Sequence, residues 1–420
     1  MKTEKTVKRL LVSRLPRSDQ RRLVIVTGAR QTGKTTLLRA IYPSLRYVSL
    51  DVHENRDWLR NLSALRWNED VGEAFIDEAQ KEPQVFEKVK YAFDAHELRF
   101  TALSGSAQIL LLHQVRESLA GRAFVYELWP LMFSELAGVR LNRNPEPPLF
   151  ARLCDGEEGL DRILAASPPQ LSPQEQAGLT SVQEHLLRWG GMPELLRLED
   201  ADRREWLRSY EHTYLERDLG DLARLADLMP FRKFQSIAAL RSAQLLAYAD
   251  LARDAGVSAE TSRRYLEYLR LSYQAFFLPP YHTNLTSQLT KAQKVYWTDT
   301  GLMRQVSAQP EGVTGPIFET FVVSELHKWV QTSGVAVKLF HYRTRSGLEA
   351  DVLVETPRGL LGIEIKARAQ ADRSDAGPLR RIAESAGSRW LGGMIVHSGT
   401  ALQRLCDPCI WSMPASRLLS

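Results

Sequence analysis

Residues 28–35, with the sequence GARQTGKT, constrain the fold of this chain more than any other feature. They fit the pattern G-x-x-x-x-G-K-[ST], in which two glycines allow the tight turns that direct backbone N–H groups at phosphates. A β-rich run, LVIVTG (23–28), precedes the motif, and a helix-forming run, TTLLRAIY (35–42), follows it. The alternative is a glycine loop without a ligand, and the strand–helix context argues against it. The sequence therefore predicts a phosphate-binding P-loop.

We expect this loop to bind ATP, with Mg²⁺ as the accompanying cation. Lys34 is expected to act on the β- and γ-phosphates, and the Thr35 hydroxyl to ligate Mg²⁺. The positive end of the helix dipole adds to the attraction. The predicted cofactor-binding residues are Gly28, Ala29, Arg30, Gln31, Thr32, Gly33, Lys34, Thr35 and Thr36.

A second acidic element follows in FIDEA (75–79), where an apolar run ends in two carboxylates. We expect Asp77 to lie near the metal ion and Glu78 to orient or deprotonate the attacking water. A solvated acidic turn after a strand is the alternative, and it is the weaker one behind a P-loop.

Strand-like and helical runs alternate over the first part of the chain. Further strands are expected at RYVSLD (46–51), LRFTALSGS (98–106) and FVYELWP (124–130). Such alternation predicts an α/β fold with a parallel sheet. Ser104 and Ser106 fit either a phosphate sensor or a serine-rich turn. Arg116 and Arg122 fit either a transition-state arginine, from the same chain or a neighbouring subunit of a homo-oligomer, or a surface position.

The remainder divides by composition into four parts. After the P-loop core at 1–140, residues 141–180 are expected to form a proline-rich insertion or linker, and residues 181–232 a helical region. Residues 233–305 predict a winged helix-turn-helix, and residues 306–420 a mixed α/β domain. In the expected recognition helix (258–270), Arg263 and Arg264 are candidate DNA contacts; a module that only packs against protein is the alternative.

Carboxylates and a lysine stand on consecutive expected strands near the C-terminus. Asp351 lies in EADVLVE, and Glu364 and Lys366 lie in GIEIKA, on one face because side chains alternate. We expect all three to be catalytic, with Asp351 and Glu364 as Mg²⁺ ligands for phosphodiester hydrolysis. Further candidate carboxylates are Glu319, Glu325 and Glu349. A solvated charged face, or a site that persists on a fold that only binds, are the alternatives.

Composition limits where the chain works. The formal net charge is +5 and the pI about 9.0, a modest basic excess that permits nucleic-acid contact without demonstrating it. The start lacks a secretory h-region, no apolar run is long enough to span a bilayer, and three cysteines imply no disulfide framework. We expect a cytoplasmic protein without a membrane partner.

An ordered set of motifs resembles one family. The set contains GARQTGKTT, FIDEAQ, LSGSAQ, SLAGR, LWPLMFSE, RWGGMPE, YLERDLGDL, VYWTDTGL, FETFVVSEL, YRTRSGLEADVLVE and LGIEIKA. It resembles bacterial and archaeal AAA-type ATPases with a C-terminal domain of unknown function, over nearly the whole chain. The resemblance implies that residues 306–420 form a restriction-endonuclease-like domain, with Asp351, Glu364 and Lys366 matching its pattern. Ala350 departs from the family, which more often has a β-branched residue there.

Three interpretations remain open from the sequence. The first is an ATPase whose nucleotide state controls how the winged helix and the nuclease-like domain engage DNA. The second is an ATP-dependent DNA-binding regulator with an inactive nuclease fold. The third is a protein-interaction scaffold that uses ATP as a structural ligand.

Overall fold

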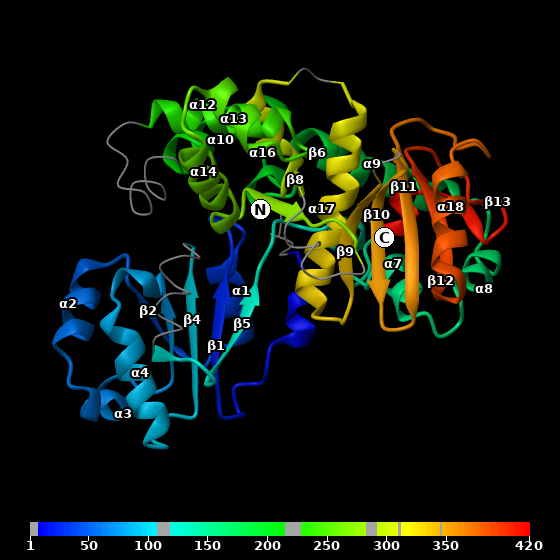
Figure 1. Ribbon diagram of the computed structural model, residues 1–420. Helices are drawn as coiled ribbons and strands as arrows, with labels where there is room; N and C mark the ends of the chain where they lie inside the picture. The colour runs from blue at the N-terminus through cyan, green and yellow to red at the C-terminus, as the bar shows by residue number, and fades with distance from the viewer. Residues whose placement is uncertain (1–6, 107–117, 215–227, 283–291, 310–311, 345–346) are drawn as a thin grey trace.

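The chain forms three packed regions in a computed structural model (Figure 1). It describes residues 7–106, 118–214, 228–282, 292–309, 312–344 and 347–420. Short 3₁₀ turns supplement the regular elements, at Leu10–Arg14, Ala64–Arg66, Ala79–Lys81, Pro193–Leu196 and Gly387–Arg389.

The N-terminal region is a five-stranded parallel sheet in the order β2-β3-β4-β1-β5. Its strands are β1 (Arg22–Thr27), β2 (Arg46–Ser49), β3 (Ala74–Asp77), β4 (Phe100–Gly105) and β5 (Ala123–Glu127), as the sequence predicts. Its helices are α1 (Lys34–Ile41), α2 (His53–Asn61), α3 (Trp67–Asp70) and α4 (Gln84–Asp94). Strand β4 separates the P-loop strand from the acidic strand β3. The three central strands, β1, β3 and β4, are covered on both faces and are buried along their length apart from Arg22.

Residues 141–180, expected to form a proline-rich insertion or linker, contain helices that pack against the rest of the protein. Four helices follow the first sheet: α6 (Phe133–Arg140), α7 (Leu149–Asp155), α8 (Leu160–Ala165) and α9 (Pro173–Trp189). The apolar side chains of α7 and α8 are buried in the same core as the C-terminal sheet. The Leu149 N–H also donates to Ser420 O at 2.9 Å, and Arg404 pairs with Asp161 at 3.0 Å. Proline, glycine and charged clusters hide these short apolar stripes in the sequence.

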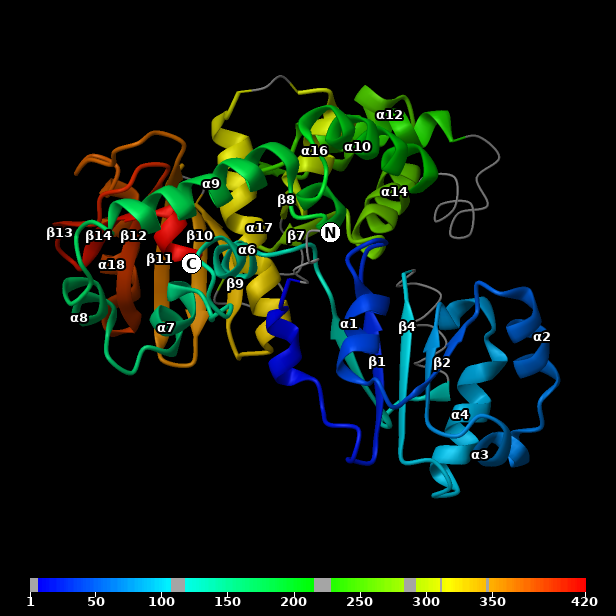
Figure 2. The same cartoon turned by 180° about the vertical axis from the view of Figure 1, so that it is seen from behind.

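The middle region combines helices with a small antiparallel sheet. The helices are α10 (Asp200–Tyr214), α12 (Met229–Leu240), α13 (Tyr248–Ala255), α14 (Ala259–Leu271) and α16 (Thr300–Ser307). The strands are β6 (Gln244–Leu245), β7 (Ala275–Leu278) and β8 (Lys294–Trp297), in the order β6-β8-β7. Helices α13 and α14 form the expected pair around Gly256, which has φ 75°. The views in Figures 1 and 2 both place α14 over the end of β1.

The C-terminal region is a six-stranded mixed sheet in the order β13-β14-β12-β11-β10-β9. Its elements are α17 (Gly315–Ser333), β9 (Lys338–Arg343), β10 (Glu349–Thr356), β11 (Gly359–Lys366), α18 (Gly377–Ala386), β12 (Trp390–His397), β13 (Gln403–Cys406), β14 (Ile410–Pro414) and α19 (Ala415–Leu418). Strands β9, β10 and β11 are antiparallel, and β12 pairs in parallel with β11 and β14. Helices α17 and α18 cover opposite faces.

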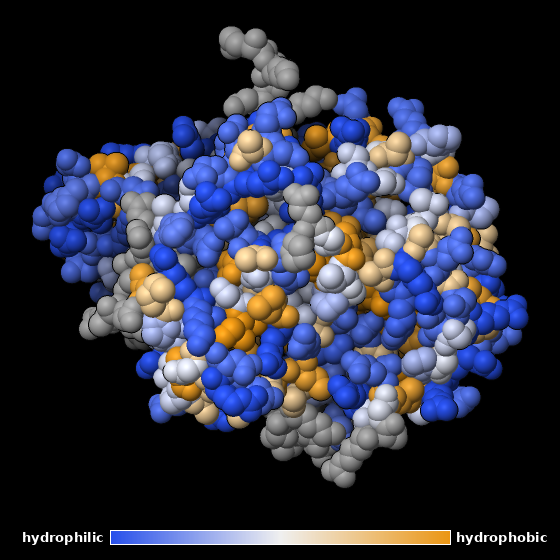
Figure 3. Space-filling model, turned by 90° about the horizontal axis from the view of Figure 1, so that it is seen from above, coloured by the Kyte–Doolittle hydropathy of each residue, from blue (hydrophilic) through white to orange (hydrophobic). Residues whose placement is uncertain are grey.

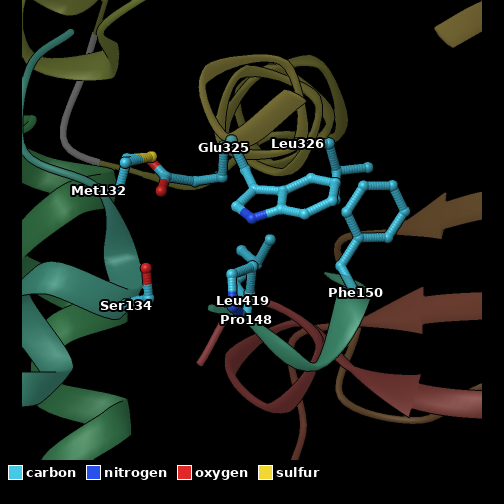
Figure 4. Close-up of a pocket in the computed structure, with 8 residues that line it drawn as sticks. Met132, Ser134, Pro148, Phe150, Glu325, Leu326 and Leu419 are labelled. Atoms are coloured by element: carbon cyan, nitrogen blue, oxygen red, sulfur yellow. The ribbon is translucent and has the colours of Figure 1, made fainter. Parts of the chain in front are cut away.

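Helix α17 joins the three regions. It is buried around most of its surface, whereas its sequence predicts an amphipathic helix. Its Glu325 accepts a 2.6 Å hydrogen bond from the Phe133 N–H at the start of α6, and it pairs with Lys328. Figure 4 shows Glu325 extending toward Met132 beside a cavity of about 10 Å³, which is the size of one water molecule. The P-loop region is thus fixed to α17 by buried polar contacts.

The face of the molecule seen from above mixes hydrophobic and hydrophilic side chains (Figure 3). Seen from above, hydrophobic areas are interrupted by hydrophilic side chains (Figure 3). Within the described ranges, no helix combines the length and apolar character needed to cross a membrane.

Candidate functional site

Two glycines give the loop after β1 its shape. A Cβ on Gly28 would lie 2.2 Å from Leu128 O, and φ there is 151°. Gly33 has φ 94°, a conformation that L-residues rarely adopt, and it begins α1 as the N-cap residue. Both positions therefore require glycine, one for close approach of backbone and one for its dihedral angle.

The Lys34 side chain folds back into the loop. Its Nζ donates to Gly28 O at 3.0 Å and to Ala29 O at 2.8 Å, and the residue is buried. Thr32 Oγ1 also donates to Ala29 O, at 3.0 Å. The ammonium is thus enclosed by the same loop whose amides would face phosphates. Of the other predicted loop residues, Arg30 is half-buried, whereas Gln31 and Thr36 are exposed.

Thr35 and Asp77 meet at the start of α1. Thr35 Oγ1 donates to Asp77 Oδ2 at 2.8 Å, although 42 positions separate them in the chain. Tyr47 OH donates to the same oxygen at 3.0 Å, and Ser104 Oγ contacts Oδ1. A hydroxyl and a carboxylate so close together suit Mg²⁺, which prefers oxygen ligands. The sequence did not single out Tyr47, because a tyrosine on an edge strand carries no motif.

Glu78 is held in an unusual conformation directly after β3. Its φ is 55°, in the left-handed region, which is uncommon for a non-glycine residue. Its carboxylate accepts from Gln80 Nε2 at 2.7 Å and from Ser106 Oγ at 3.2 Å. Ser104 and Ser106 therefore each hydrogen-bond one of the two predicted carboxylates.

Side chains far from the loop in sequence close around it. From the middle region, Tyr210 OH donates to Arg30 O at 3.3 Å. Tyr273 OH donates to Thr27 Oγ1 at 3.2 Å and to Glu127 Oε1 at 3.3 Å. Burial raises the pKa of Tyr273 and that of Glu127. No local pattern in the sequence marks these contacts.

Arg9 braces the loop from the opposite direction. Its Nη1 donates to Thr32 O at 2.8 Å, and its Nη2 donates to Trp129 O at 2.5 Å. Its Nε pairs with Glu135 Oε2 at 3.1 Å, with both side chains almost fully buried. A lysine- and arginine-rich start reads as a solvated segment, so sequence reasoning missed this residue.

Arg122 does not belong to the nucleotide site of its own chain. It precedes β5, whose first residue Ala123 pairs with Leu23 at the beginning of β1. The P-loop follows the C-terminal end of β1. Arg122 therefore lies at the opposite end of the strands from the P-loop. Its guanidinium pairs with Asp94 on the surface, at 2.7 Å. The catalytic role expected of Arg122 stays a prediction, which its position within its own chain does not support. Arg116 lies outside the described residues.

The structure brings the C-terminal constellation together. Asp351 Oδ2 accepts the Ile365 N–H at 2.8 Å, and Lys366 Nζ donates to Glu364 Oε1 at 2.7 Å. The register between β9 and β10 shifts at this point, between Ala350 and Leu353. Burial and the nearby Asp351 carboxylate raise the pKa of Glu364 to about 7.

A lysine that the sequence did not single out occupies the centre of this cluster. Lys294 Nζ, from β8 of the middle region, lies 3.1 Å from Glu319 Oε1, 3.1 Å from Glu349 Oε1 and 3.4 Å from Asp351 Oδ1. Burial and the Asp351 carboxylate raise the pKa of Glu319 to about 7. Glu325 belongs to the α6 junction and not to this cluster.

The predicted magnesium site at Asp351 and Glu364 does not fit the observed arrangement. The Lys294 ammonium neutralises Asp351 Oδ1, a backbone N–H uses Oδ2, and Lys366 uses Glu364 Oε1. Across the described ranges, no three His, Cys, Asp or Glu side chains are grouped so as to hold a metal ion. The metal-ligand role expected of Asp351 and Glu364 therefore stays a prediction, which these lysine and backbone contacts do not support.

The two predicted DNA contacts lie on the surface of α14. Arg263 and Arg264 are both exposed near its N-terminal end, where Ser258 caps the helix by accepting the Thr261 N–H at 3.1 Å. The Arg263 guanidinium lies 5.3 Å from the centroid of the Tyr248 ring.

Comparison with known proteins identifies parts of the chain. Residues 20–137 match the family model of an AAA domain. Residues 180–311 and 314–418 match two domains of unknown function, DUF8612 and DUF4143. Uncharacterized proteins of Mycobacterium bovis and Mycobacterium tuberculosis are each 28% identical over 359 residues, covering 82% of this chain and 70% of theirs.

Solved structures are more distant. A Walker-type ATPase of Pyrococcus abyssi is 16% identical and covers 72% of this chain and 97% of its own, with a TM-score of 0.43. The Orc1 protein of Aeropyrum pernix, in complex with DNA, is 14% identical and covers 69% of this chain and 87% of its own, with a TM-score of 0.25. The chain thus contains an AAA-type P-loop ATPase domain, followed by two domains of unknown function.

Proposed function

We propose that this protein binds and hydrolyses MgATP, and that the nucleotide controls how its middle region engages DNA. The proposal of MgATP binding rests on the 2.8 Å hydrogen bond between Thr35 and Asp77. The loop that precedes Thr35 requires glycine at Gly28 and Gly33. This is the arrangement that P-loop enzymes use to hold a cation beside phosphate oxygens.

Each residue has a defined part in the proposed reaction. Lys34 exchanges its carbonyl partners, Gly28 O and Ala29 O, for phosphate oxygens. Thr35 and Asp77 hold Mg²⁺, which neutralises phosphate charge when bound. Glu78 orients the attacking water and accepts its proton. Its contacts with Gln80 and Ser106 fix the carboxylate in place.

The middle region has the order of elements of a winged helix, with α12, β6, α13 and α14 followed by the β7–β8 hairpin. We propose that α14 reads DNA through Arg263 and Arg264. Tyr210 and Tyr273 connect the same region to the loop that would hold the phosphates. Nucleotide binding is thereby communicated to the DNA-binding surface.

For the C-terminal region, the arrangement favours a restriction-endonuclease-like fold that does not cleave. A metal-dependent nuclease needs carboxylates that are free to bind a cation. Here Lys294 is paired with three of them. We therefore favour an ATP-dependent DNA-binding protein over an ATP-driven nuclease.

The nucleotide proposal is tested by Lys34→Ala. ATP turnover should be abolished because the ammonium no longer reaches the phosphates, a loss of about 100-fold or more. Lys338→Ala, which removes an exposed lysine of β9, is the matched control and should hydrolyse normally. Unchanged turnover in Lys34→Ala would show that another site, or another protein in the sample, hydrolyses the ATP.

The DNA proposal is tested by the double variant Arg263→Ala/Arg264→Ala. DNA affinity should fall, and the slope of log K against log salt should decrease by about one for each lost phosphate contact. Arg140→Ala/Arg162→Ala removes equal charge from exposed positions outside the middle region. Equal losses in both double variants would mean that net charge, and not α14, attracts DNA.

A further inference from the structure

Strand β8 of the middle region directs two polar side chains from one of its faces toward the C-terminal region. Lys294 and Tyr296 lie two positions apart, so their side chains point to the same side of the strand. Both reach Glu319 on α17, with Tyr296 OH donating to Glu319 Oε1 at 2.6 Å and Lys294 Nζ at 3.1 Å. Val295, between them, is buried in the core of the middle region.

The Lys294 ammonium is a buried cation that three carboxylates share. Its side chain is only 4% exposed, and its partners come from α17 and from β10. A lysine is rarely buried to this degree unless it is paired. The carboxylates of Glu319 and Asp351 also need a partner of opposite charge, because both side chains are largely buried.

Lysine side chains supply the positive charge in the cluster. Four carboxylates, those of Glu319, Glu349, Asp351 and Glu364, face two ammonium groups, those of Lys294 and Lys366. Lys294 contacts three of the four, and Lys366 contacts the fourth.

We propose that the carboxylate cluster is an ionic latch that fastens the middle region to the C-terminal region, with Lys294 in the place of a metal ion. The latch makes the C-terminal sheet the anchor of the middle region. It joins elements that three different stretches of the chain supply: β8, α17 and β10. The inference does not depend on ATP hydrolysis, so it can fail while the proposed function holds.

The latch is tested by amide hydrogen exchange on the full chain carrying Lys294→Met. Methionine keeps the length of the side chain and removes its charge, so the buried carboxylates lose their partner. Amides of β8 and of the first turns of α17 should exchange about tenfold faster or more, because the regions separate locally. Lys338→Met is the control for loss of an exposed lysine and should leave this exchange unchanged. Lys294→Arg, which keeps the charge, should retain most of the protection.

Binding of Mn²⁺, followed by electron paramagnetic resonance, separates a latch from a metal site. The wild-type protein and Asp351→Asn should bind the same amount of Mn²⁺. Asp351-dependent binding to the wild-type protein would overturn the proposal, as would unchanged exchange in folded Lys294→Met. If Lys294→Met does not fold, Lys294→Gln provides the same exchange test with a smaller disturbance.

Discussion

Arg9 shows how a single side chain can support a catalytic loop without touching its ligand. It binds the carbonyl of Thr32 and pairs with Glu135, which in turn accepts the N–H of Leu10 at 2.8 Å and that of Met132 at 3.0 Å. The position of the P-loop is thereby tied to the start of α6. Arg9 is a positioning residue, and its effect should reach ATP through the loop.

We expect Arg9→Met to weaken ATP binding and to destabilise the protein. The buried Glu135 carboxylate loses its partner, which costs about 3–5 kcal/mol when one side of a buried pair is removed. KM for ATP should rise more than kcat falls, because the loop is displaced while Glu78 is untouched. Steady-state kinetics and thermal melting measure both effects. Arg17→Met, at an exposed arginine, is the control; equal behaviour of the two variants would refute the bracing role.

Glu364 gives a prediction for pH dependence. Its pKa in the folded protein is raised to about 7, above the ordinary value of 4.5. The folded state therefore holds this proton more tightly than the unfolded state, and the associated stability is present below about pH 4.5 and is lost as the pH rises through about 7.

Glu364→Gln should remove that loss, because an amide cannot ionise. The melting temperature of the variant, relative to wild type, should increase between pH 5 and pH 8, by an amount that corresponds to at most about 3 kcal/mol. Glu355→Gln, which changes a half-buried glutamate on the neighbouring strand β10, is the control. A difference that shrinks toward pH 8 would show that the Glu364 carboxylate is not held protonated.

Among the helices and strands, local sequence patterns predicted those whose formation is determined by residues close by in the sequence. The strand before Gly28, the helix after Gly33 and the acidic end of β3 were all predictable, because each is a short run with its own signal. Helices α7 and α8 were not, because charged and proline-rich turns break their apolar residues into pieces too short to recognise. Periodicity also suggested that one side of α17 faces solvent, and packing against three regions overrides it.

The site residues divide in the same way. Lys34, Thr35, Asp77 and Glu78 stand in motifs that one sequence reveals. Arg9, Tyr273 and Lys294 act across long separations, since they are 23, 246 and 57 residues from Thr32, Thr27 and Asp351. Nothing in a local window states which distant side chain will meet a loop. For Arg122, closeness in sequence to a strand does not indicate at which end of the strand the residue lies.

The contact between Tyr273, which follows α14, and Thr27 of the P-loop strand β1 yields a further prediction. Tyr273→Phe keeps the ring, which packs edge-on against Trp129 at 5.2 Å, but it removes the hydroxyl that bonds Thr27 and Glu127. We expect ATP hydrolysis to change by less than about threefold, whereas the effect of ATP on DNA affinity is reduced. Fluorescence anisotropy of labelled DNA, with and without ATP, measures the coupling. A coupling equal to that of wild type would exclude this hydroxyl from the connection.

In the whole molecule, each of the three regions makes polar contacts with the other two. The P-loop region is fixed to α17 through Glu325, the middle region reaches the P-loop through Tyr273, and Lys294 holds the middle region to the C-terminal sheet. A change at the nucleotide therefore acts on a closed ring of contacts. This arrangement suits a regulator whose domains respond together, and it supplies a physical basis for the proposed control of DNA engagement.

A single-turnover measurement with Glu78→Gln and radiolabelled MgATP tests whether the P-loop site hydrolyses ATP. The amide keeps the size of the side chain but cannot accept a proton from water. We expect the variant to bind ATP about as well as wild type and to hydrolyse it at least about 100-fold more slowly. Hydrolysis at the wild-type rate, or loss of ATP binding together with hydrolysis, would contradict the role assigned to Glu78 and the site built around it.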